Sequence, residues 1–543
     1  MKMNALKMNP RMLMRIVVIA IAVGIVGWQW RAKQRAPHGN DAERTTATST
    51  ATATPAAAST APAKPVKPAP PATIRLGTLT LTACELKAPH GGAGVPAFCT
   101  KFPVPENRGD PKSRRIDLKV AIVKSDSTVP EKDMVVYLAG GPGQSATETF
   151  PQLATAFAPL QKHHDILVLD QRGTGGSHAL SCPEVEKAQK GQQDLPFDAA
   201  RVKADIAKCL AEVEKTADPR YYTTTIAVAD LEAVRQALGA PKFDLIGISY
   251  GTRMAQQYAT AHPDAVRSIV LDSVAPNTLI LGETFASDLE RALKLQAEAC
   301  LATPACKQAF GDWRKTLLDL HAQLAAKPVE NAGFRDPRTN EPATRNVTGD
   351  TLAGLVHLFA YNAEASALLP LDVAQAAKGD FAPLLAQTQI GEGDLSGNMN
   401  GGMQLSVMCS EDAPFLTARP GDADTLLGTR PIERIQAACS VWPRGAVPKD
   451  FHAPFKSSIP TLILSGERDP VTPPRFAGEV LKGLANGRVL ELKGMGHGEL
   501  TIGCMPKLVN EFIDKLDPKQ LDAACLKRIG PIPAFVNFNG AAP

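Results

Sequence analysis

The sequence predicts an α/β fold with a mostly parallel sheet that is interrupted by a large helical insertion. Short apolar runs alternate with segments of helical periodicity over residues 134–271 and again over 461–516. These runs lack the strict alternation of a strand with one exposed face, which is typical of parallel strands buried on both faces. The interval between the two stretches is far longer than a strand-to-helix loop of ~2 to 6 residues, so it must hold an inserted domain.

The strands are predicted from the apolar runs. Two β-rich stretches come at residues 74–84 and 115–123, and the buried strands follow at 134–138, 166–169, 243–246, 268–271, 461–465 and 488–492. Helices are predicted at 226–238, 252–261, 475–484 and 506–516. The helix at 252–261 ends before Pro263, because proline cannot continue a helix. The core is therefore expected in two parts, residues 74–275 and 446–543.

The insertion is predicted to span residues 276–445 and to form a lid. Four segments in it carry helical spacing of apolar residues, namely 289–301, 313–324, 351–361 and 432–439. We therefore expect a mainly helical lid.

Residues 1–35 are predicted to be a signal peptide or an N-terminal membrane anchor. Basic residues up to Arg15 precede an uncharged apolar run at 16–30. A basic stretch before an apolar stretch is typical of both devices. The bulky Trp28 and Trp30 leave no clear small-residue cleavage site, which favours an uncleaved anchor. A buried helix of the fold is the remaining alternative.

Residues 36–73 are predicted to be a linker. From 45 to 73 the chain contains only Ala, Thr, Ser, Pro, two Lys and one Val. Such a segment has no large apolar side chains whose burial could offset the entropy of ordering it, so a solvated tether is expected.

The overall composition indicates a soluble globular part without affinity for nucleic acid. Hydrophobic residues make up 44% and charged residues 21% of the chain. Residues 1–75 contain 11 Lys and Arg against 2 Asp and Glu, so the net charge of +4 belongs to the N-terminal segment. The remainder is slightly acidic, which is a poor electrostatic footprint for nucleic acid.

The ten cysteines fall as neighbours in the sequence and predict five local disulfides in an exported protein. The expected pairs are Cys84 with Cys99, Cys182 with Cys209, Cys300 with Cys306, Cys409 with Cys439 and Cys504 with Cys525. An even number of cysteines spread in this way is typical of oxidising compartments, although spacing alone does not fix connectivity. Buried free thiols of a cytosolic protein are the alternative. No Cys or His spacing typical of zinc is present, so no metal site is expected.

The strongest catalytic motif is Gly-Ile-Ser-Tyr-Gly at residues 247–251. It lies directly after the predicted strand 243–246 and before the predicted helix 252–261. A serine nucleophile in such a strained strand-to-helix turn needs small residues two positions away on each side. Ser249 is therefore the candidate nucleophile, with an ordinary tight turn as the alternative.

A serine hydroxyl needs a general base, and the base needs an orienting acid. Asp469 and His497 each follow a late strand, in the order serine, acid, histidine. Sites of α/β sheets lie at the carboxyl ends of the strands, where both residues are expected. The alternative acid is Asp272, which ends the strand after the serine turn and is otherwise a structural turn residue.

A glycine-rich loop follows the strand at 134–138. Its sequence, Gly-Gly-Pro-Gly at residues 140–143, allows the backbone to approach a substrate closely. The amides of Gly141 and Tyr250 are the candidate oxyanion hole.

Together these motifs, with Asp-Gln-Arg-Gly-Thr-Gly-Gly-Ser at 170–177, resemble the proline iminopeptidase and tripeptidyl aminopeptidase group of α/β-hydrolase serine peptidases. The resemblance runs from about residue 74 to the C-terminus and implies the α/β-hydrolase fold. Ala139 departs from the histidine that proline iminopeptidases usually have before the glycines. The long lid and the cysteine-rich C-terminal part look closer to exported tripeptidyl aminopeptidases.

The combined prediction is an exported serine exopeptidase that releases short N-terminal units from peptide substrates and needs no cofactor. The protein is expected in the periplasm, tethered to the inner membrane by its N-terminal segment, or secreted if that segment is cleaved. The acidic pair Glu411 and Asp412, near the end of the lid, is predicted to bind the substrate's free amine, and a solvated turn is the alternative. A carboxylic ester hydrolase with the same triad and a non-catalytic envelope-binding protein are the alternative functions.

Overall fold

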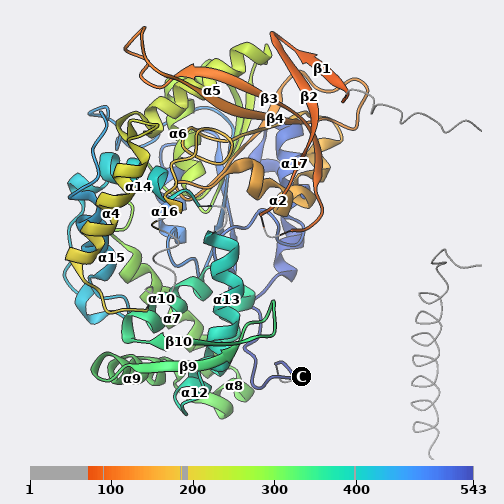
Figure 1. Ribbon diagram of the computed structural model, residues 1–543. Helices are drawn as coiled ribbons and strands as arrows, with labels where there is room; N and C mark the ends of the chain where they lie inside the picture. Colours follow the sequence, from red (N-terminus) through yellow and green to blue (C-terminus); the bar gives the residue numbers. More distant parts are fainter. Residues whose placement is uncertain (1–70, 90, 184, 186–193, 397–398, 542–543) are drawn as a thin grey trace, which may run out of the picture. The chain divides into compact units, whose positions relative to one another are not determined.

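A sheet of ten strands runs through the described part of the computed structural model, which covers residues 71–541 apart from 90, 184, 186–193 and 397–398 (Figure 1). The strands are β1 (Thr73–Leu76), β2 (Leu79–Leu86), β3 (Val95–Pro105), β4 (Arg115–Val123), β5 (Met134–Leu138), β6 (Ile166–Leu169), β7 (Phe243–Ile248), β8 (Val266–Asp272), β11 (Thr461–Gly466) and β12 (Gly487–Leu492). Their spatial order is β1-β2-β3-β4-β6-β5-β7-β8-β11-β12. The first four strands pair antiparallel, as does β4 with β6, and all later pairs are parallel.

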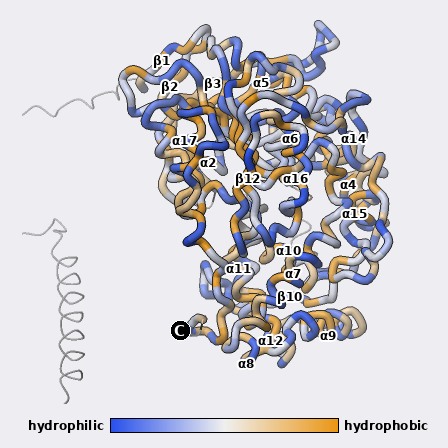
Figure 2. The backbone as a smooth tube through the Cα atoms, turned by 180° about the vertical axis from the view of Figure 1, so that it is seen from behind, coloured by the Kyte–Doolittle hydropathy of each residue, from blue (hydrophilic) through white to orange (hydrophobic). Residues whose placement is uncertain are grey.

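Helices cover both faces of this sheet. On one face α2 (Ala146–Gln161) packs with α17 (Met505–Lys515), and on the other lie α5 (Thr224–Leu238), α6 (Tyr250–Ala261) and α16 (Pro474–Leu481). Successive strand residues point to opposite faces, so Val135 and Val136 belong to two different apolar clusters. In Figure 2 the orange, apolar segments gather where the strands run through the molecule. The predicted α/β fold with a mostly parallel sheet is confirmed.

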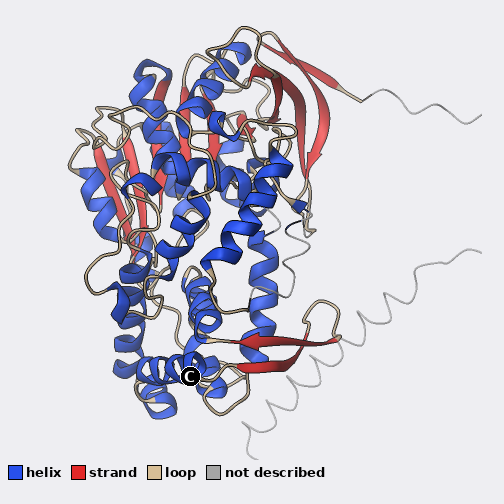
Figure 3. Ribbon diagram, turned by 60° about the vertical axis from the view of Figure 1, so that its left-hand side comes forward, coloured by secondary structure: helices blue, strands red, loops and turns tan. Residues whose placement is uncertain are grey.

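The lid contains the helices α7 (Phe285–Ala302), α8 (Pro304–Phe310), α9 (Trp313–Ala326), α10 (Gly349–Ala360), α11 (Ala363–Ser366), α12 (Leu369–Ala376), α13 (Ala382–Ser396), α14 (Gly401–Glu411) and α15 (Arg430–Cys439). It also contains an antiparallel hairpin of β9 (Val329–Arg335) and β10 (Pro342–Val347), which Figure 3 shows apart from the main sheet. Much of the lid has its own apolar cluster, with Trp313 at 1% exposure among its members. The lid is mainly helical, but the hairpin was not predicted from the sequence.

All five predicted disulfides are formed between sequence neighbours. They join Cys84 to Cys99, Cys182 to Cys209, Cys300 to Cys306, Cys409 to Cys439 and Cys504 to Cys525. All ten cysteines of the sequence lie among the described residues, and none of them is free. The predicted pairing is confirmed.

The predicted anchor or signal at 1–35 lies outside the described residues, as does the predicted linker up to residue 70. The ordered strands begin with Thr73, next to the predicted start at Ile74. Over the part of the chain that the structure describes, no helix combines the length and the apolar character needed to cross a membrane.

Candidate active site

Ser249 lies in a tight turn between β7 and α6, at the edge where the parallel strands end. Its backbone has φ 56° and ψ −123°, a conformation that non-glycine residues seldom adopt. The amide of Ser249 donates to the carbonyl of Asp272 at 2.9 Å. The predicted strand-turn-helix geometry is thus present, and it presents the Ser249 side chain at the edge of the sheet.

The two glycines that flank Ser249 are required by close backbone contacts. A Cβ at Gly251 would overlap the carbonyl oxygen of Leu138 at the end of β5. A Cβ at Gly247 would overlap the carbonyl of Gly251. Helix α6 therefore begins so close to β5 and to the end of β7 that only glycine fits at these two positions.

Asp469 and His497 form a hydrogen-bonded pair at the same edge of the sheet. Asp469 follows β11, His497 follows β12, and Oδ2 of Asp469 lies 2.8 Å from Nδ1 of His497. The carboxylate of Asp469 also accepts from the amide and the hydroxyl of Thr472, at 2.8 and 2.7 Å. Because Nδ1 donates to the carboxylate, Nε2 is left to accept a proton from a hydroxyl group.

Electrostatics favour a charge-separated state of this pair. Burial alone would raise the pKa of Asp469, but the His497 charge and the hydrogen bonds from His497 and Thr472 hold it below its usual value. Burial lowers the pKa of His497, yet the carboxylates of Asp469 and Asp272 outweigh that effect and raise it above its usual value. The imidazole is therefore a stronger base here than in water.

The loop at 140–143 follows β5 and lies directly beside the serine turn. A Cβ placed on Gly140 would be 3.2 Å from Cβ of Ser249. Gly141 has φ 107°, which favours glycine. Tyr250 is the first residue of α6, and the first amides of a helix have no intrahelical partner. The structure thus brings both predicted oxyanion segments next to Ser249.

Several residues of the lid contact the site, and two of these contacts hold the loops beside Ser249 and at His497. Asn400 donates from its amide and from Nδ2 to the carbonyl of Gly143, at 2.8 and 3.0 Å. The carbonyl of Tyr361, just after α10, accepts from the amide of His497 at 2.7 Å, and the two rings are 5.1 Å apart in an edge-on arrangement. The oxyanion loop and the histidine loop are therefore both fixed by the lid.

The carboxylates of Glu411 and Asp412 are buried and bonded to the protein. Asp412 accepts from Nη1 of Arg253, 3.1 Å from both oxygens, and from the amide of Leu281 at 3.1 Å. Glu411 accepts from the amide and the hydroxyl of Thr224, at 2.7 and 2.9 Å. Both residues are 0% exposed, and burial raises the pKa of Glu411 to about 8. The alternative of a solvated turn is wrong, while amine binding stays a prediction.

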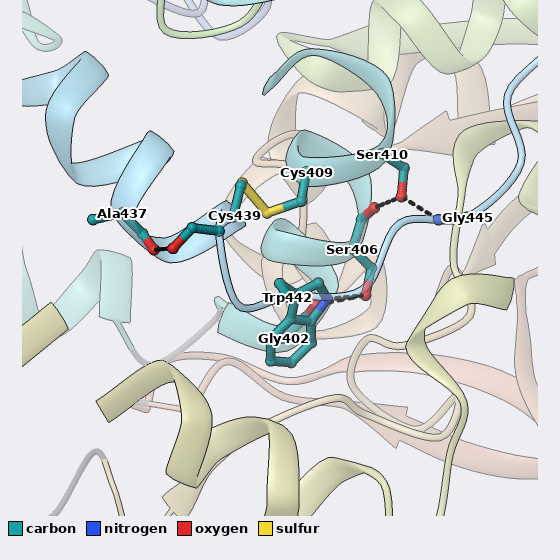
Figure 4. Close-up of a disulfide and its surroundings, with 9 residues drawn as sticks. Gly402, Ser406, Cys409, Ser410, Ala437, Cys439, Trp442 and Gly445 are labelled. Atoms are coloured by element: carbon teal, nitrogen blue, oxygen red, sulfur yellow. Dashed lines mark hydrogen bonds between the residues drawn. A yellow bond between two sulfur atoms is a disulfide. The ribbon is translucent and has the colours of Figure 1, made fainter. Parts of the chain in front are cut away.

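A disulfide, drawn in Figure 4, fixes helix α14, whose last residue is Glu411. Cys409 is bonded to Cys439 of α15, and Nε1 of Trp442 donates to the hydroxyl of Ser406 at 3.0 Å. The hydroxyl of Ser410 accepts from the amide of Gly445 at 2.9 Å. The end of α14 is thus held by α15 and the segment after it, in addition to the ion pair of Asp412 with Arg253.

Three residues of the site were not predicted from the sequence, and a fourth, Asp272, was predicted only as an alternative acid. Asn400, Tyr361 and Thr472 are single residues of common types, and no spacing pattern distinguishes them. Asp272, the alternative acid, does not take the place of Asp469, because its carboxylate accepts from the amides of Glu499 and Leu500. Within the described residues, no group of three or more Asp, Glu, His or Cys side chains is arranged to hold a metal ion.

The fold and the site together define a serine hydrolase of the α/β type. Over residues 133–498 the sequence matches the family model of the alpha/beta hydrolase fold, and the chain belongs to this family. The predicted α/β-hydrolase fold is confirmed.

The similar curated proteins are peptidases. A tripeptidyl aminopeptidase of Streptomyces coelicolor is 25% identical over 464 residues, which cover 77% of this chain and 80% of that protein. The serine protease Hip1 of Mycobacterium tuberculosis is 24% identical over 475 residues, covering 79% of this chain and 86% of that protein. A proline iminopeptidase of Neisseria gonorrhoeae is 29% identical over 149 residues, which cover 27% of this chain and 35% of that protein. The predicted resemblance to this group is confirmed.

Among solved structures, a proline iminopeptidase of Mycobacterium smegmatis is similar at 15% identity with a TM-score of 0.35, covering 77% of this chain and 99% of that chain.

Proposed function

We propose that this protein is an exported serine exopeptidase that releases short units from peptide N-termini through an acyl-enzyme. The observation that carries the proposal is the bonded pair of Asp469 and His497 at the sheet edge that also holds the strained turn of Ser249. Relatives named tripeptidyl aminopeptidase and serine protease, similar over more than three quarters of the chain, support peptides as the substrates.

The proposed reaction begins when Oγ of Ser249 attacks the scissile carbonyl. His497 takes the hydroxyl proton at Nε2 and then gives it to the leaving amine, while Asp469 holds the imidazolium through Nδ1. The amides of Gly141 and Tyr250 donate to the oxyanion of the tetrahedral intermediate. Water then attacks the acyl-enzyme with His497 again as the base, and the serine hydroxyl is restored.

Amine recognition by Glu411 and Asp412 is part of this proposal. An exopeptidase must distinguish a chain end from a chain interior, and the distinguishing group is one ammonium. Asp412 is already paired with Arg253, so Glu411 is the stronger candidate, and an ammonium bound beside it would favour its charged form against the effect of burial. Its partner Thr224 is hydrogen-bonded through the hydroxyl to that of Tyr250, at 2.6 Å, so one threonine links the acid to the residue that follows Ser249.

The catalytic assignment is tested by substituting the serine. Ser249→Ala is expected to lower peptide hydrolysis on the order of 10⁴-fold or more, because triad residues act as a unit. The comparison uses peptide anilides, small acetate esters and labelling by a fluorophosphonate. Turnover of esters but of no peptide in a library would reject the peptidase proposal and leave an ester hydrolase. Absence of labelling in the unmutated protein would leave a non-catalytic binding protein.

Amine recognition has its own test. Glu411→Gln is expected to raise KM for peptides with a free N-terminus and to leave the hydrolysis of acetate esters, which have no amine, nearly unchanged. Asp412→Asn is compared in the same assays. Equal cleavage of free and N-acetylated peptides by the unmutated enzyme would eliminate the proposal.

Export is supported by the five disulfides, which persist in oxidising compartments, and by the basic and apolar pattern at residues 1–35. We expect fractionation to find the protein in the envelope or the medium. A full-length chain with free thiols in the cytosol would overturn this part of the proposal.

A further inference from the structure

Asp272, the last residue of β8, is bonded to both halves of the candidate site. Its carboxylate is 0% exposed and accepts from the amide of Glu499, at 2.8 and 2.9 Å to the two oxygens, and from the amide of Leu500 at 2.9 Å. These amides lie two and three residues after His497. Its carbonyl accepts from the amide of Ser249 at 2.9 Å. One residue therefore connects the serine turn with the histidine loop.

Ser273 extends this junction by one residue. Its backbone has φ 55°, a conformation that costs a non-glycine residue energy and persists only where the surroundings hold it. Its hydroxyl accepts from the amide of Gly498 at 2.8 Å, and its own amide donates to the carbonyl of Leu464 in β11 at 3.0 Å. Three successive amides of the histidine loop, at 498, 499 and 500, thus bind residues 272 and 273.

The carboxylate of Asp272 also acts on the imidazole through its charge. The titratable groups that it faces are His497, Asp469, Glu499 and Tyr137. Burial raises the pKa of Asp272 to about 6, against the effect of the two amides, so the group is largely ionised at neutral pH. Burial and the neighbouring carboxylates raise the pKa of Glu499 to about 9, so that group is neutral there. The negative charges next to His497 are therefore those of Asp469 and Asp272.

We propose that Asp272 is a positioning residue that acts through His497. It fixes the histidine loop relative to Ser249, and its charge stabilises the imidazolium that forms when the Ser249 proton moves from Oγ to Nε2. Asp272 itself neither gains nor loses a proton in this step. The inference rests on the proposed serine chemistry and not on the choice of peptides as substrates.

The test compares Asp272→Asn with the unmutated enzyme over pH 5 to 9. The rate of fluorophosphonate labelling at Ser249 is measured together with kcat/KM on a peptide anilide. We expect both rates to fall on the order of 10²-fold at neutral pH, as for a catalytic group that is slightly misplaced. Removing a negative charge disfavours the imidazolium, so the acidic limb of both profiles is expected to move to lower pH.

Asp244→Asn is the matched control. Asp244 is also 0% exposed, lies near the start of β7, and is bonded to Arg267 and Ser268 instead of the site. It is expected to leave the acidic limb in place, whatever its effect on the melting temperature. The proposal is overturned if Asp272→Asn also leaves the acidic limb of the pH profiles in place and its lower rate is explained by a smaller fraction of folded protein.

A second variant covers the case in which Asp272→Asn does not fold. Ser273→Ala removes the bond to Gly498 but keeps the charge, so we expect slower labelling with an unmoved acidic limb. Labelling as fast as in the unmutated enzyme would overturn the positioning role. Labelling of Ser249 without cleavage of any peptide would reject the proposed peptidase function and leave this test intact.

Discussion

Arg253 on α6 and Asp412 at the end of α14 form an ion pair that is 0% exposed at both side chains. Arg253 lies four residues after Ser249, and it also donates to the carbonyl of Leu279. The pair thus joins the helix that begins at the serine turn to the lid. Because both charges are out of water, each depends on the other for compensation.

Removing one member of this pair should be costly. Arg253→Met is expected to lower the free energy of unfolding by about 3 to 5 kcal/mol, since it leaves the Asp412 carboxylate buried and uncompensated. Urea unfolding at neutral pH measures the loss. The double variant Arg253→Met, Asp412→Leu is expected to recover much of it. A single variant within about 1 kcal/mol of the unmutated protein would contradict the ion-pair argument.

The pH dependence of activity follows from the base. His497 must be neutral to accept a proton, and its neighbouring carboxylates raise its pKa above the ordinary 6.5. Activity should therefore fall as the pH drops through that raised pKa. The profile of kcat/KM between pH 5 and 9 is expected to have its acidic midpoint above 6.5. A midpoint well below this value would show that the carboxylates do not act as described.

A methyl group at Gly251 should disrupt the serine turn. In Gly251→Ala the new Cβ would overlap the carbonyl oxygen of Leu138, and backbone cannot yield as a flexible side chain can. We expect a loss of roughly 2 kcal/mol or more in the free energy of unfolding, with a large loss of activity. Gly354→Ala is the control, because the same atom in the exposed part of α10 has no neighbour within 4 Å. That variant should gain about 0.5 to 1 kcal/mol from helix propensity.

Asp372 in the lid should make stability depend on pH. Its Oδ1 accepts from Nε2 of Gln387 at 3.1 Å, whereas Oδ2 and the Gln387 carbonyl oxygen are buried without a hydrogen-bond partner in the described structure. A proton on Oδ2 would remove the buried negative charge. Burial accordingly raises the pKa of Asp372 to about 7.

The sign of the effect follows from this raised pKa. The unfolded chain loses the proton near pH 4 and the folded chain near 7, so stability falls as the pH rises through this window. Asp372→Asn imitates the protonated form, and it should flatten the dependence and stabilise the protein above pH 7 by a few kcal/mol. Thermal unfolding at pH 5 and 8 measures the change. Parallel curves for the two proteins would disprove the prediction.

The elements that were predicted well are those with the strongest local signal. Strands β5 and β6 span the expected residues, because strands buried on both faces are continuous apolar runs. Strand β3 was not predicted, because Pro96, Pro103 and Pro105 argue against a strand. Helix α2 was not predicted either, because it contains Pro151 and Pro159. Tertiary packing overrides local preference in both cases.

In the candidate site, too, the residues with a local sequence motif were predicted, and the contacts between distant segments were not. Ser249, Asp469 and His497 are carried by motifs at strand ends, and the structure brings them to one edge of the sheet. The burial of Glu411 and Asp412 could not be read from the sequence, because their partners Thr224 and Arg253 are more than 150 residues away along the chain. The local sequence of an acidic pair before a turn is the same whether its carboxylates face solvent or bind buried partners.

The order of the disulfides bears on how the chain matures. Each cysteine is bonded to the next unpaired one along the sequence, with separations of 15, 27, 6, 30 and 21 residues. A chain that meets an oxidant from its N-terminal end can therefore complete each bond before the next pair emerges. Correct oxidation of such a chain would need no later reshuffling. Wrong pairs, whose rearrangement takes seconds to hours, would arise in chains that are oxidised after full release.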